Sequence, residues 1–340
     1  MARLTDIEEQ LLEPVTDSRF RASLTALREA TEGIWAPEAP RIIQDYTDHS
    51  ITHSERVAGF AARLLAANEG RELSAQEIYL LLAGIYLHDI GMQCDVCRFS
   101  EIKERGEELG GKFELEFDVD TSSGYSLDQQ KAVRDNHQYL TAAWIDYARR
   151  TGTTVLGPAA RTIPEDLVAD LMDICKYHSR LPLTGCPLFF RFDPTHRKQL
   201  VAALLRFADE LDVDGNRASI ETVKTFRLPP RSSVYWWLHN RTKVVLSARN
   251  VILLTIRLHP DDAKQYGPFV HAGFITEFQT KNRPVLGVLR QNAVPMAIDA
   301  DSEVVQDRYT EPLPLEIVEA LQALEKEAMV KLAELLVRSF

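Results

Sequence analysis

The chain is 340 residues long, with 45% hydrophobic and 26% charged residues. At about 150 residues per domain, this length predicts roughly two domains and a core that folds without disulfides or a structural metal. Lysine and arginine total 39 against 50 aspartate and glutamate, so the formal net charge is -11. Such a surface repels polyanions, which argues against a general DNA-binding protein and against binding to an anionic membrane.

Cysteine usage and the apolar segments indicate a cytoplasmic protein. The four cysteines are too few and too irregularly spaced for a disulfide framework, which favours a reducing compartment. Residues 1–15 carry acidic side chains where a signal peptide needs an apolar run. The longest apolar stretch, residues 78–90, is shorter than the ~20 residues that span a bilayer. We therefore expect no membrane partner.

The first two thirds of the chain have the apolar periodicity of helices. Asp48 or Ser50 is the expected N-cap of the second helix, and Ser74 with Glu77 forms a capping box for the third. Residues 98–126 are rich in Glu, Gly, Ser and Asp and are interpreted as a mobile insertion or lid. Helices are predicted over residues 4–30, 52–68, 74–92, 127–150, 164–177 and 196–211.

The pattern changes after residue 216. Strands are predicted over residues 234–239, on both sides of a turn at 248–250, and over 294–300, with a helix over 260–289. An amphipathic helix over 315–340 is expected to pack on its own domain, and a dimerising coil is the alternative. The predicted fold is mainly α: an N-terminal helical segment (1–44), a helical domain (45–219), and a small α+β domain with a C-terminal helix (220–340).

Six histidines and aspartates are distributed over the helical region, five of them on predicted apolar helices. They are His53, His88, Asp89, His137, His178 and Asp209. An unpaired imidazole or carboxylate is costly to bury, and one shared metal centre would satisfy all six. Nitrogen and oxygen ligands without cysteine suit hydrolytic chemistry on Mn, Fe, Ni, Mg or Zn. The alternative is a set of separately satisfied buried polar groups.

The six residues can be divided between two ions. His53, His88, Asp89 and Asp209 would leave open positions on a first ion for water and a phosphate oxygen. His137 and His178 would hold a second ion on the far side of a bridging Asp89, or would act as a general acid or phosphate contact beside a single ion. His49 and Asp48 are interpreted as supporting or capping residues outside the ligand set.

The order H…HD…H…H…D on consecutive helices resembles the HD superfamily of metal-dependent phosphohydrolases. Its landmarks are LHDIGM and LLRFADELD, and the resemblance covers residues ~45–217. DHSITHSERV, RDNHQYLTAAWI, ICKYHS and LLRFADELDVDGNR are most similar to the HD branch found in bacterial conflict systems. The resemblance implies a helical HD domain over 45–219, one or two divalent ions, and hydrolysis of a phosphoester or phosphoanhydride.

In this interpretation a metal-bound water is the nucleophile, and basic residues neutralise the charge on the phosphoryl oxygens. The expected catalytic residues are Asp89, His137, His178 and Lys176. The expected substrate contacts are Arg56, Arg134, Arg180 and Arg217. The acidic charge balance favours a small phosphorylated substrate such as a nucleotide. A homo-oligomer formed through the C-terminal region is a further expectation.

Three other functions are alternatives for the same residues. A single-strand nuclease would need a local basic groove, for which the candidates are Arg191, Arg197, Lys198 and Arg206. A nucleotide-sensing module would use the same site without turnover. The ligand set also resembles that of the di-iron oxygenases related to myo-inositol oxygenase. The Cys94–Cys97 pair is a weak zinc or redox signal, and Tyr235–Trp237 would stack on a base or, more commonly, form a core.

Overall fold

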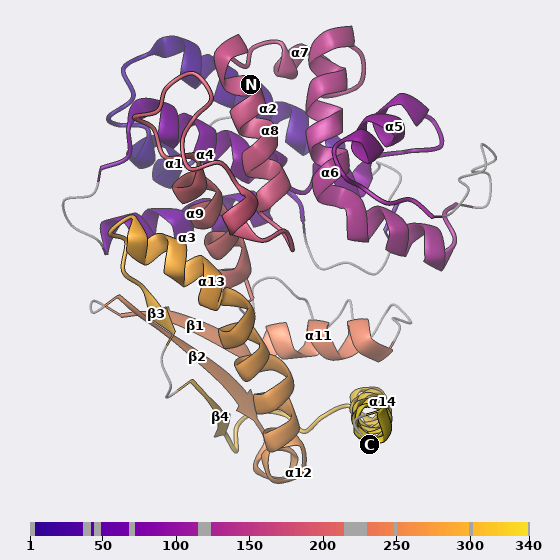
Figure 1. Ribbon diagram of the computed structural model, residues 1–340. Coiled ribbons are helices and arrows are strands. Elements are labelled where there is room, and N and C mark those ends of the chain that lie inside the picture. The colour runs from indigo at the N-terminus through magenta and orange to yellow at the C-terminus, as the bar shows by residue number, and fades with distance from the viewer. Residues whose placement is uncertain are drawn as a thin grey trace. The chain divides into compact units, whose positions relative to one another are not determined.

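The computed structural model describes residues 4–36, 42–43, 49–67, 72–114, 124–213, 230–247, 250–298 and 302–338. Contacts divide the chain into a larger unit (Met1–Gln44, His49–Asp212 and Pro284–Pro295) and a smaller one (Asp45–Asp48, Val213–Arg283 and Met296–Phe340). The larger unit is helical, and the smaller one combines helices with a small sheet (Figure 1). The predicted fold class is therefore confirmed, whereas the domain limits at 44 and 219 stay predictions.

The N-terminal region contains two helices where the sequence predicted one over 4–30. Helix α1 spans Asp6–Leu11 and α2 spans Ser18–Ile34. Pro14 lies between them and has no N–H with which to continue a helix. Asp17 then begins α2 by accepting a hydrogen bond from the backbone N–H of Arg19. The single-helix prediction was wrong because it followed the apolar spacing across a proline.

Two further helices form the centre of the larger unit. Helix α3 spans Ile51–Ala66 and begins at the cap Ser50; Asp48, the other candidate cap, lies outside the described residues. Helix α4 spans Ala75–Leu87 and begins with the predicted capping box of Ser74 and Glu77. Its side chains are buried on all sides from Ile78 to Leu87, as expected of a helix enclosed by others.

Glu77 also joins the start of α4 to the start of α9 (Lys198–Leu211). The side chain is 2% exposed, and its oxygens accept hydrogen bonds from the Arg197 guanidinium at 2.8 Å and from two backbone N–H groups. Although burial favours the neutral acid, these hydrogen bonds hold the pKa of Glu77 below its ordinary value. A depressed carboxyl pKa stabilises the fold above the unfolded-state pKa, and the effect is lost as pH falls through the folded-state pKa.

We therefore expect Glu77→Gln to lower the free energy of unfolding by about 2 kcal/mol at pH 7. At an acid pH below the folded-state pKa of Glu77 the wild-type carboxyl is itself protonated, so the two proteins should differ much less. Urea denaturation at both pH values measures this. Glu108→Gln, which removes a surface partner of Arg105 that is 66% exposed, is the control and should change little at either pH. An equal effect of Glu77→Gln at both pH values would contradict the assignment.

Residues 98–126 contain a packed helix. Helix α5 spans Ser100–Glu108 and packs against α6, which spans Leu127–Thr151. Ile102 and Gly106, four residues apart, are buried on the side that faces this helix. The described part of the segment is thus ordered by a narrow apolar stripe that its overall polarity concealed. Residues 115–123 lie outside the described residues, and a lid function stays a prediction.

The remaining helices of the larger unit match their predictions closely. Helix α6 ends at Gly152, which takes the left-handed conformation (φ +70°) typical of a helix C-terminus. After α7 (Gly157–Ala160) and a single 3-10 turn (Glu165–Leu167), α8 spans Val168–Tyr177. Another 3-10 turn (Leu183–Gly185) precedes α9, which spans Lys198–Leu211 and buries one broad apolar face.

The smaller unit begins with a helix where the sequence predicted a strand. Helix α11 spans Pro230–Arg241 and includes the run VYWWLH. This run has high β propensity, but Val234, Trp237 and Leu238 are spaced i, i+3 and i+4 and are all buried, so a helix places them together in the core. Trp236 is 7% exposed as well. The tryptophans therefore belong to the core, and the base-stacking alternative is not supported.

The sheet of the smaller unit is built on β2. Strands β1 (Thr242–Leu246) and β2 (Val251–Leu258) are antiparallel, with Val244 opposite Leu254, and residues 248 and 249 of the predicted turn lie outside the described residues. The other edge of β2 pairs in parallel with β3 (Ala297–Ile298) and then with β4 (Glu303–Gln306). Side chains alternate along β2, and those of Ile252, Leu254 and Ile256 are fully buried.

Three helical segments and a final helix remain, and the third segment belongs to the larger unit from Pro284 on. Helix α12 (Pro260–Val270), a π-helical turn (His271–Thr276) and α13 (Glu277–Gln291) occupy the predicted helix over 260–289. Helix α14 (Leu315–Arg338) packs on α11 and buries Ile317 and Leu321. This confirms the helix and its packing on its own unit, whereas dimerisation stays a prediction. Among the described residues, no helix is both long and apolar enough to cross a membrane.

Candidate metal centre

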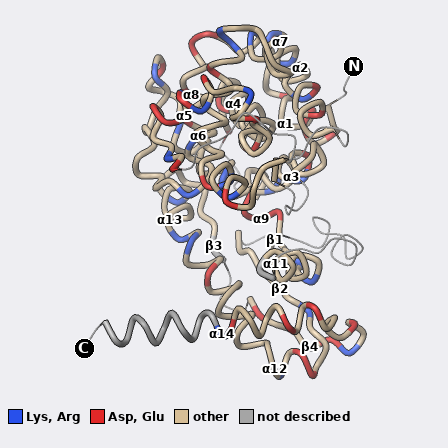
Figure 2. The backbone as a smooth tube through the Cα atoms, turned by 90° about the vertical axis from the view of Figure 1, so that its right-hand side faces the viewer, with Lys and Arg blue, Asp and Glu red and all other residues tan. Residues whose placement is uncertain are grey.

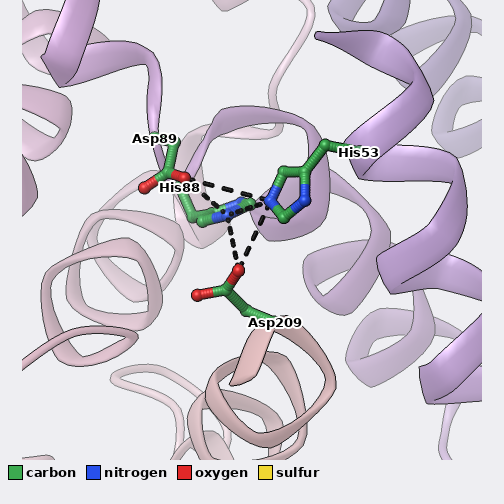
Figure 3. Close-up of side chains that lie close together, drawn as sticks. All are labelled: His53, His88, Asp89 and Asp209. Carbon is green, nitrogen blue, oxygen red and sulfur yellow. Dashed lines mark hydrogen bonds and ion pairs between the residues drawn. The ribbon is translucent and has the colours of Figure 1, made fainter. Parts of the chain in front are cut away.

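Three separate helices bring the first four predicted ligands together (Figure 3). His53 lies in the first turn of α3, His88 directly follows the last residue of α4, and Asp209 lies in the last turn of α9. Asp89 comes between α4 and the 3-10 turn Ile90–Gln93. Its backbone lies in the bridge region (φ -104°, ψ 0°), which is sparsely populated in proteins and common at active sites.

The turn that carries Asp89 is bound to α6 through Thr141. The Thr141 hydroxyl accepts a hydrogen bond from the N–H of Gly91 at 2.9 Å and donates one to the carbonyl of His88 at 2.8 Å. Both partners lie in the backbone of residues 88–91, which we call the HD turn, and Thr141 is fully buried. This contact sets the position of the His-Asp pair relative to α6, which carries His137.

His53, His88, Asp89 and Asp209 form what we call the first group. The Nε2 atoms of His53 and His88 are 3.3 Å apart, and Asp209 Oδ1 lies 3.3 Å from the first and 3.7 Å from the second. Asp89 Oδ2 lies 3.2 Å from His88 Nε2. Neighbouring ligands that are about 2.1 Å from one ion lie roughly 3.0–3.4 Å from each other. One cation therefore fits among these atoms.

Asp89, His137 and His178 form the second group. Asp89 Oδ1 lies 3.4 Å from His137 Nε2 and 3.3 Å from His178 Nε2, and the two imidazole nitrogens are 3.1 Å apart. Asp89 thus directs one carboxylate oxygen to each group. Within the described residues, these are the two sets of three or more His, Cys, Asp or Glu ligand atoms close enough to hold an ion.

The protonation of the imidazoles supports a cation in each group. The Nδ1 atoms of His88 and His137 lie 3.0 and 2.6 Å from the carbonyls of Ile85 and Arg134, and that of His178 contacts the carbonyl of Cys175. A carbonyl only accepts, so in each ring Nδ1 carries the hydrogen and Nε2 presents a lone pair. Lone pairs that face each other across about 3 Å repel unless a proton or a metal ion lies between them.

Burial and the neighbouring groups also shift the pKa values of the residues in the centre. Burial lowers the pKa of His137 to about 4, so this imidazole is neutral at pH 7. Burial also disfavours a charged His88, but the Asp89 and Asp209 carboxylates outweigh it and raise the pKa of His88 well above its ordinary value. Burial opposes ionisation of Asp89 too, yet the adjacent imidazoles hold its pKa well below the usual range. The ion-free centre thus retains a proton that a metal ion displaces.

Two supporting residues complete the geometry. His49, which the sequence placed outside the ligand set, lies with Nδ1 2.8 Å from Asp89 Oδ2. Asp212, which we did not predict, is fully buried and lies with Oδ2 2.6 Å from His53 Nδ1. Its signal in the sequence is its place three residues after Asp209, about one helical turn further along. Such a residue is expected on the same face as the ligand.

Several basic residues that we expected to bind substrate or act in catalysis have carboxylate partners. Arg56 Nε donates to Asp212 Oδ1 at 2.8 Å, Arg180 pairs with Asp135 at 3.0 Å, and Lys176 lies 3.5 Å from Asp173. The side chain of Arg134 is exposed, while its carbonyl binds His137. Arg217 lies outside the described residues.

Three of the four cations suggested for a nuclease groove are bound by other groups of the protein. Lys198 is 3% exposed and lies within 2.8 Å of both Asp170 and Asp173. Arg197 is held by Glu77, and Arg206 donates to the carbonyl of Leu181. Figure 2 shows charges of both signs interspersed along the larger unit. Arg197, Lys198 and Arg206 therefore serve the internal structure, whereas Arg191 is exposed, and the nuclease alternative stays a prediction.

The CxxC motif does not form a metal or redox site in the described residues. Cys94 is completely buried, and burial raises the pKa of its thiol well above the ordinary value. Cys97 is half-buried, and its N–H donates to the hydroxyl of Tyr125. A buried thiol with a raised pKa is a poor nucleophile and a poor ligand.

A helical unit that brings H…HD…H…H…D to one buried centre has the features of an HD-type domain. The family model HD-CE matches residues 43–275, and the chain belongs to this family. The match continues beyond the helical region into α12 of the smaller unit. Neither the curated proteins nor the solved structures contain a match to this chain. The HD-type domain and its ligand cluster are consistent with a metal-dependent hydrolase.

Proposed function

We propose that the protein is a divalent-metal-dependent phosphohydrolase or phosphodiesterase that acts on a small phosphorylated substrate, in particular a nucleotide. The observation that supports this most is the position of Asp89, whose two oxygens face two groups of imidazole nitrogens. A carboxylate in that position can bridge two ions, the arrangement that stabilises both oxygens of an in-line phosphoryl displacement. The six predicted ligands are retained in this proposal, with Mn, Fe, Ni, Mg or Zn as the ions.

The bound ions would lower the pKa of a water molecule and supply hydroxide at neutral pH. The chain contributes the ligands and a largely water-free setting. His53 and His88 are 1% exposed, whereas Asp209 is 21% exposed and His137 is 11% exposed. Substrate would therefore reach the centre on the side where Asp209 and His137 meet solvent. Asp209 also brings negative charge that a cation must neutralise before phosphate can bind.

The ion pairs reduce the number of basic side chains that can bind a phosphate group. Lys176 is partly exposed, and its distance to Asp173 is longer than a hydrogen bond, so Lys176 is proposed as the side chain that can turn to a phosphoryl oxygen. Arg134, Arg180 and Arg217 stay proposals for substrate binding. Arg56 is reassigned because Asp212 binds it. The net charge of -11 and the neutralised cations of α9 support a small substrate over a nucleic acid.

A substrate panel tests the proposal. The protein would be loaded with Mn²⁺ and offered nucleoside mono-, di- and triphosphates, cyclic nucleotides and labelled single-stranded oligonucleotides. We expect release of phosphate or opening of a phosphodiester with at least one nucleotide, loss of this activity with a chelator, and recovery on adding the ion back. Glu165→Gln, at a side chain 94% exposed, is the control and should match the wild type. Bound ions without turnover of any phosphorylated compound would contradict the hydrolase.

A further inference from the structure

Asp212 binds His53 and Arg56 at the same time. One carboxylate oxygen, Oδ2, lies 2.6 Å from Nδ1 of His53, and the other, Oδ1, accepts a hydrogen bond of 2.8 Å from Nε of Arg56. The two partners are three residues apart on α3, so they lie on one face of that helix. Asp212 itself follows the last residue of α9, and its N–H donates to the carbonyl of Asp209.

His53 differs from the other three imidazoles in the partner of its Nδ1 atom. The other three bind a carbonyl of their own helix three residues earlier, and that contact forms with the helix. His53 instead faces a buried carboxylate 159 residues further along the chain. A carboxylate behind an imidazole fixes the hydrogen on Nδ1 and makes Nε2 a stronger metal ligand.

We propose that Asp212 is a positioning residue that creates the first metal group by fixing the tautomer of His53. The proposal rests on the metal centre of the proposed function. Arg56 has a part in the same device, because it holds the second oxygen of Asp212 and so orients the carboxylate. Asp212 is not itself a ligand in either group, and its effect reaches the ion through Nε2 of His53.

The two oxygens of Asp212 have different partners, so the proposal predicts a specific effect of Asp212→Asn. An asparagine at position 212 has one acceptor oxygen and one donor amide. The Arg56 guanidinium can only donate, so it takes the oxygen and leaves the amide facing Nδ1 of His53. The imidazole must then accept at Nδ1 and carry its hydrogen on Nε2, where that hydrogen blocks a metal ion. The same wrong-tautomer effect is known when asparagine replaces the aspartate of a serine-protease triad.

The experiment compares Mn²⁺ binding by the whole chain and by three variants. Equilibrium dialysis counts the ions, and electron paramagnetic resonance reports whether two of them are coupled. We expect two coupled ions in the wild type and a single uncoupled ion in Asp212→Asn. In this variant the affinity of the first group for Mn²⁺ should fall by about 10–100-fold or more. Glu77→Gln is the matched control: it alters a buried carboxylate bound to an arginine in the same unit, and it should keep two ions.

The double variant Arg56→Met/Asp212→Asn separates a tautomer effect from a structural one. Without the guanidinium, the asparagine can turn its oxygen to His53 Nδ1, and we expect the second ion to return. A structural role for the Arg56–Asp212 pair predicts the opposite, that the double variant is at least as defective as Asp212→Asn. Nitrogen NMR of ion-free protein should find the hydrogen of His53 on Nε2 in Asp212→Asn and on Nδ1 in the double variant.

The outcomes distinguish this inference from the proposed function. If Asp212→Asn binds two ions like the wild type, or if the double variant recovers nothing, the role of Asp212 is overturned and the metal centre stands. If the wild-type chain binds no ion, the metal centre itself is contradicted and the role of Asp212 with it.

Discussion

Replacing Asp89 by alanine is expected to remove both ions and to lower metal-dependent hydrolysis about a thousandfold or more. Asp89 is the residue shared by the two groups, with Oδ2 directed to His88 and Oδ1 to His137 and His178. Its loss leaves the second group with no carboxylate and the first group with Asp209 alone to offset a divalent cation in a buried site. Ion content by elemental analysis and phosphate release by the same preparation measure the two effects together.

Asp209→Ala is the comparison that isolates the bridging role. Asp209 belongs to the first group alone, so this variant should lose one ion and keep the ion held by Asp89, His137 and His178. Both variants remove one carboxylate from the same centre. They differ in that Asp89 belongs to both groups and Asp209 to one. One tightly held ion remaining in Asp89→Ala would show that Asp89 does not bridge.

The second large effect is expected from Gly91→Ala. A Cβ at this position would lie 2.1 Å from the carbonyl oxygen of His137 and 2.7 Å from the backbone nitrogen of Thr141. Both atoms belong to the backbone of α6, which cannot move aside as a flexible side chain can. The HD turn must then separate from α6, which breaks its hydrogen bonds to Thr141 and draws Asp89 away from His137. We expect a loss of about 3 kcal/mol in stability and of the second ion.

Thermal unfolding and ion content measure the Gly91→Ala effect, and Gly59→Ala is its control. Gly59 lies within α3, and the nearest atom to a Cβ there is the side-chain Cδ1 of Ile7 at 3.7 Å, an ordinary contact. Alanine is favoured over glycine inside a helix by roughly 0.5–1 kcal/mol, so Gly59→Ala should be neutral or slightly stabilising. Equal stability of the two variants would show that the HD turn can accommodate a Cβ at position 91, contrary to these distances.

The ligand cluster was accessible from sequence because its signals are local. His53, His88 and His178 stand on or beside strongly apolar helices, where a histidine needs a partner, and the His-Asp pair directly follows the most apolar helix of the chain. Capping residues such as Ser50 and Ser74 located the helix starts. Periodicity and caps act within a few residues, so one sequence contains enough information to predict them.

What the sequence did not reveal depends on residues far apart along the chain. Lys198 and Arg197 look like surface cations until their partners Asp170 and Glu77 are brought beside them by folding. The helix over 230–241 has the propensity of a strand, and its helical form is decided by burial of Val234 and Trp237 in the smaller unit. Asp212 lies three residues after Asp209 in the sequence, but its role depends on the distant His53, which folding brings beside it.

The contacts behind the imidazoles also imply an order of assembly. His88 and His178 follow the last residues of α4 and α8, where backbone carbonyls lack partners within the helix, and each ring binds such a carbonyl. These two ligands are therefore prepared as soon as their own helices form. His53 is prepared only when the C-terminal end of α9 reaches it, and the same step delivers Asp209. An ion held by the first group thus reports that α9 has docked, whereas the second group can be completed earlier in folding.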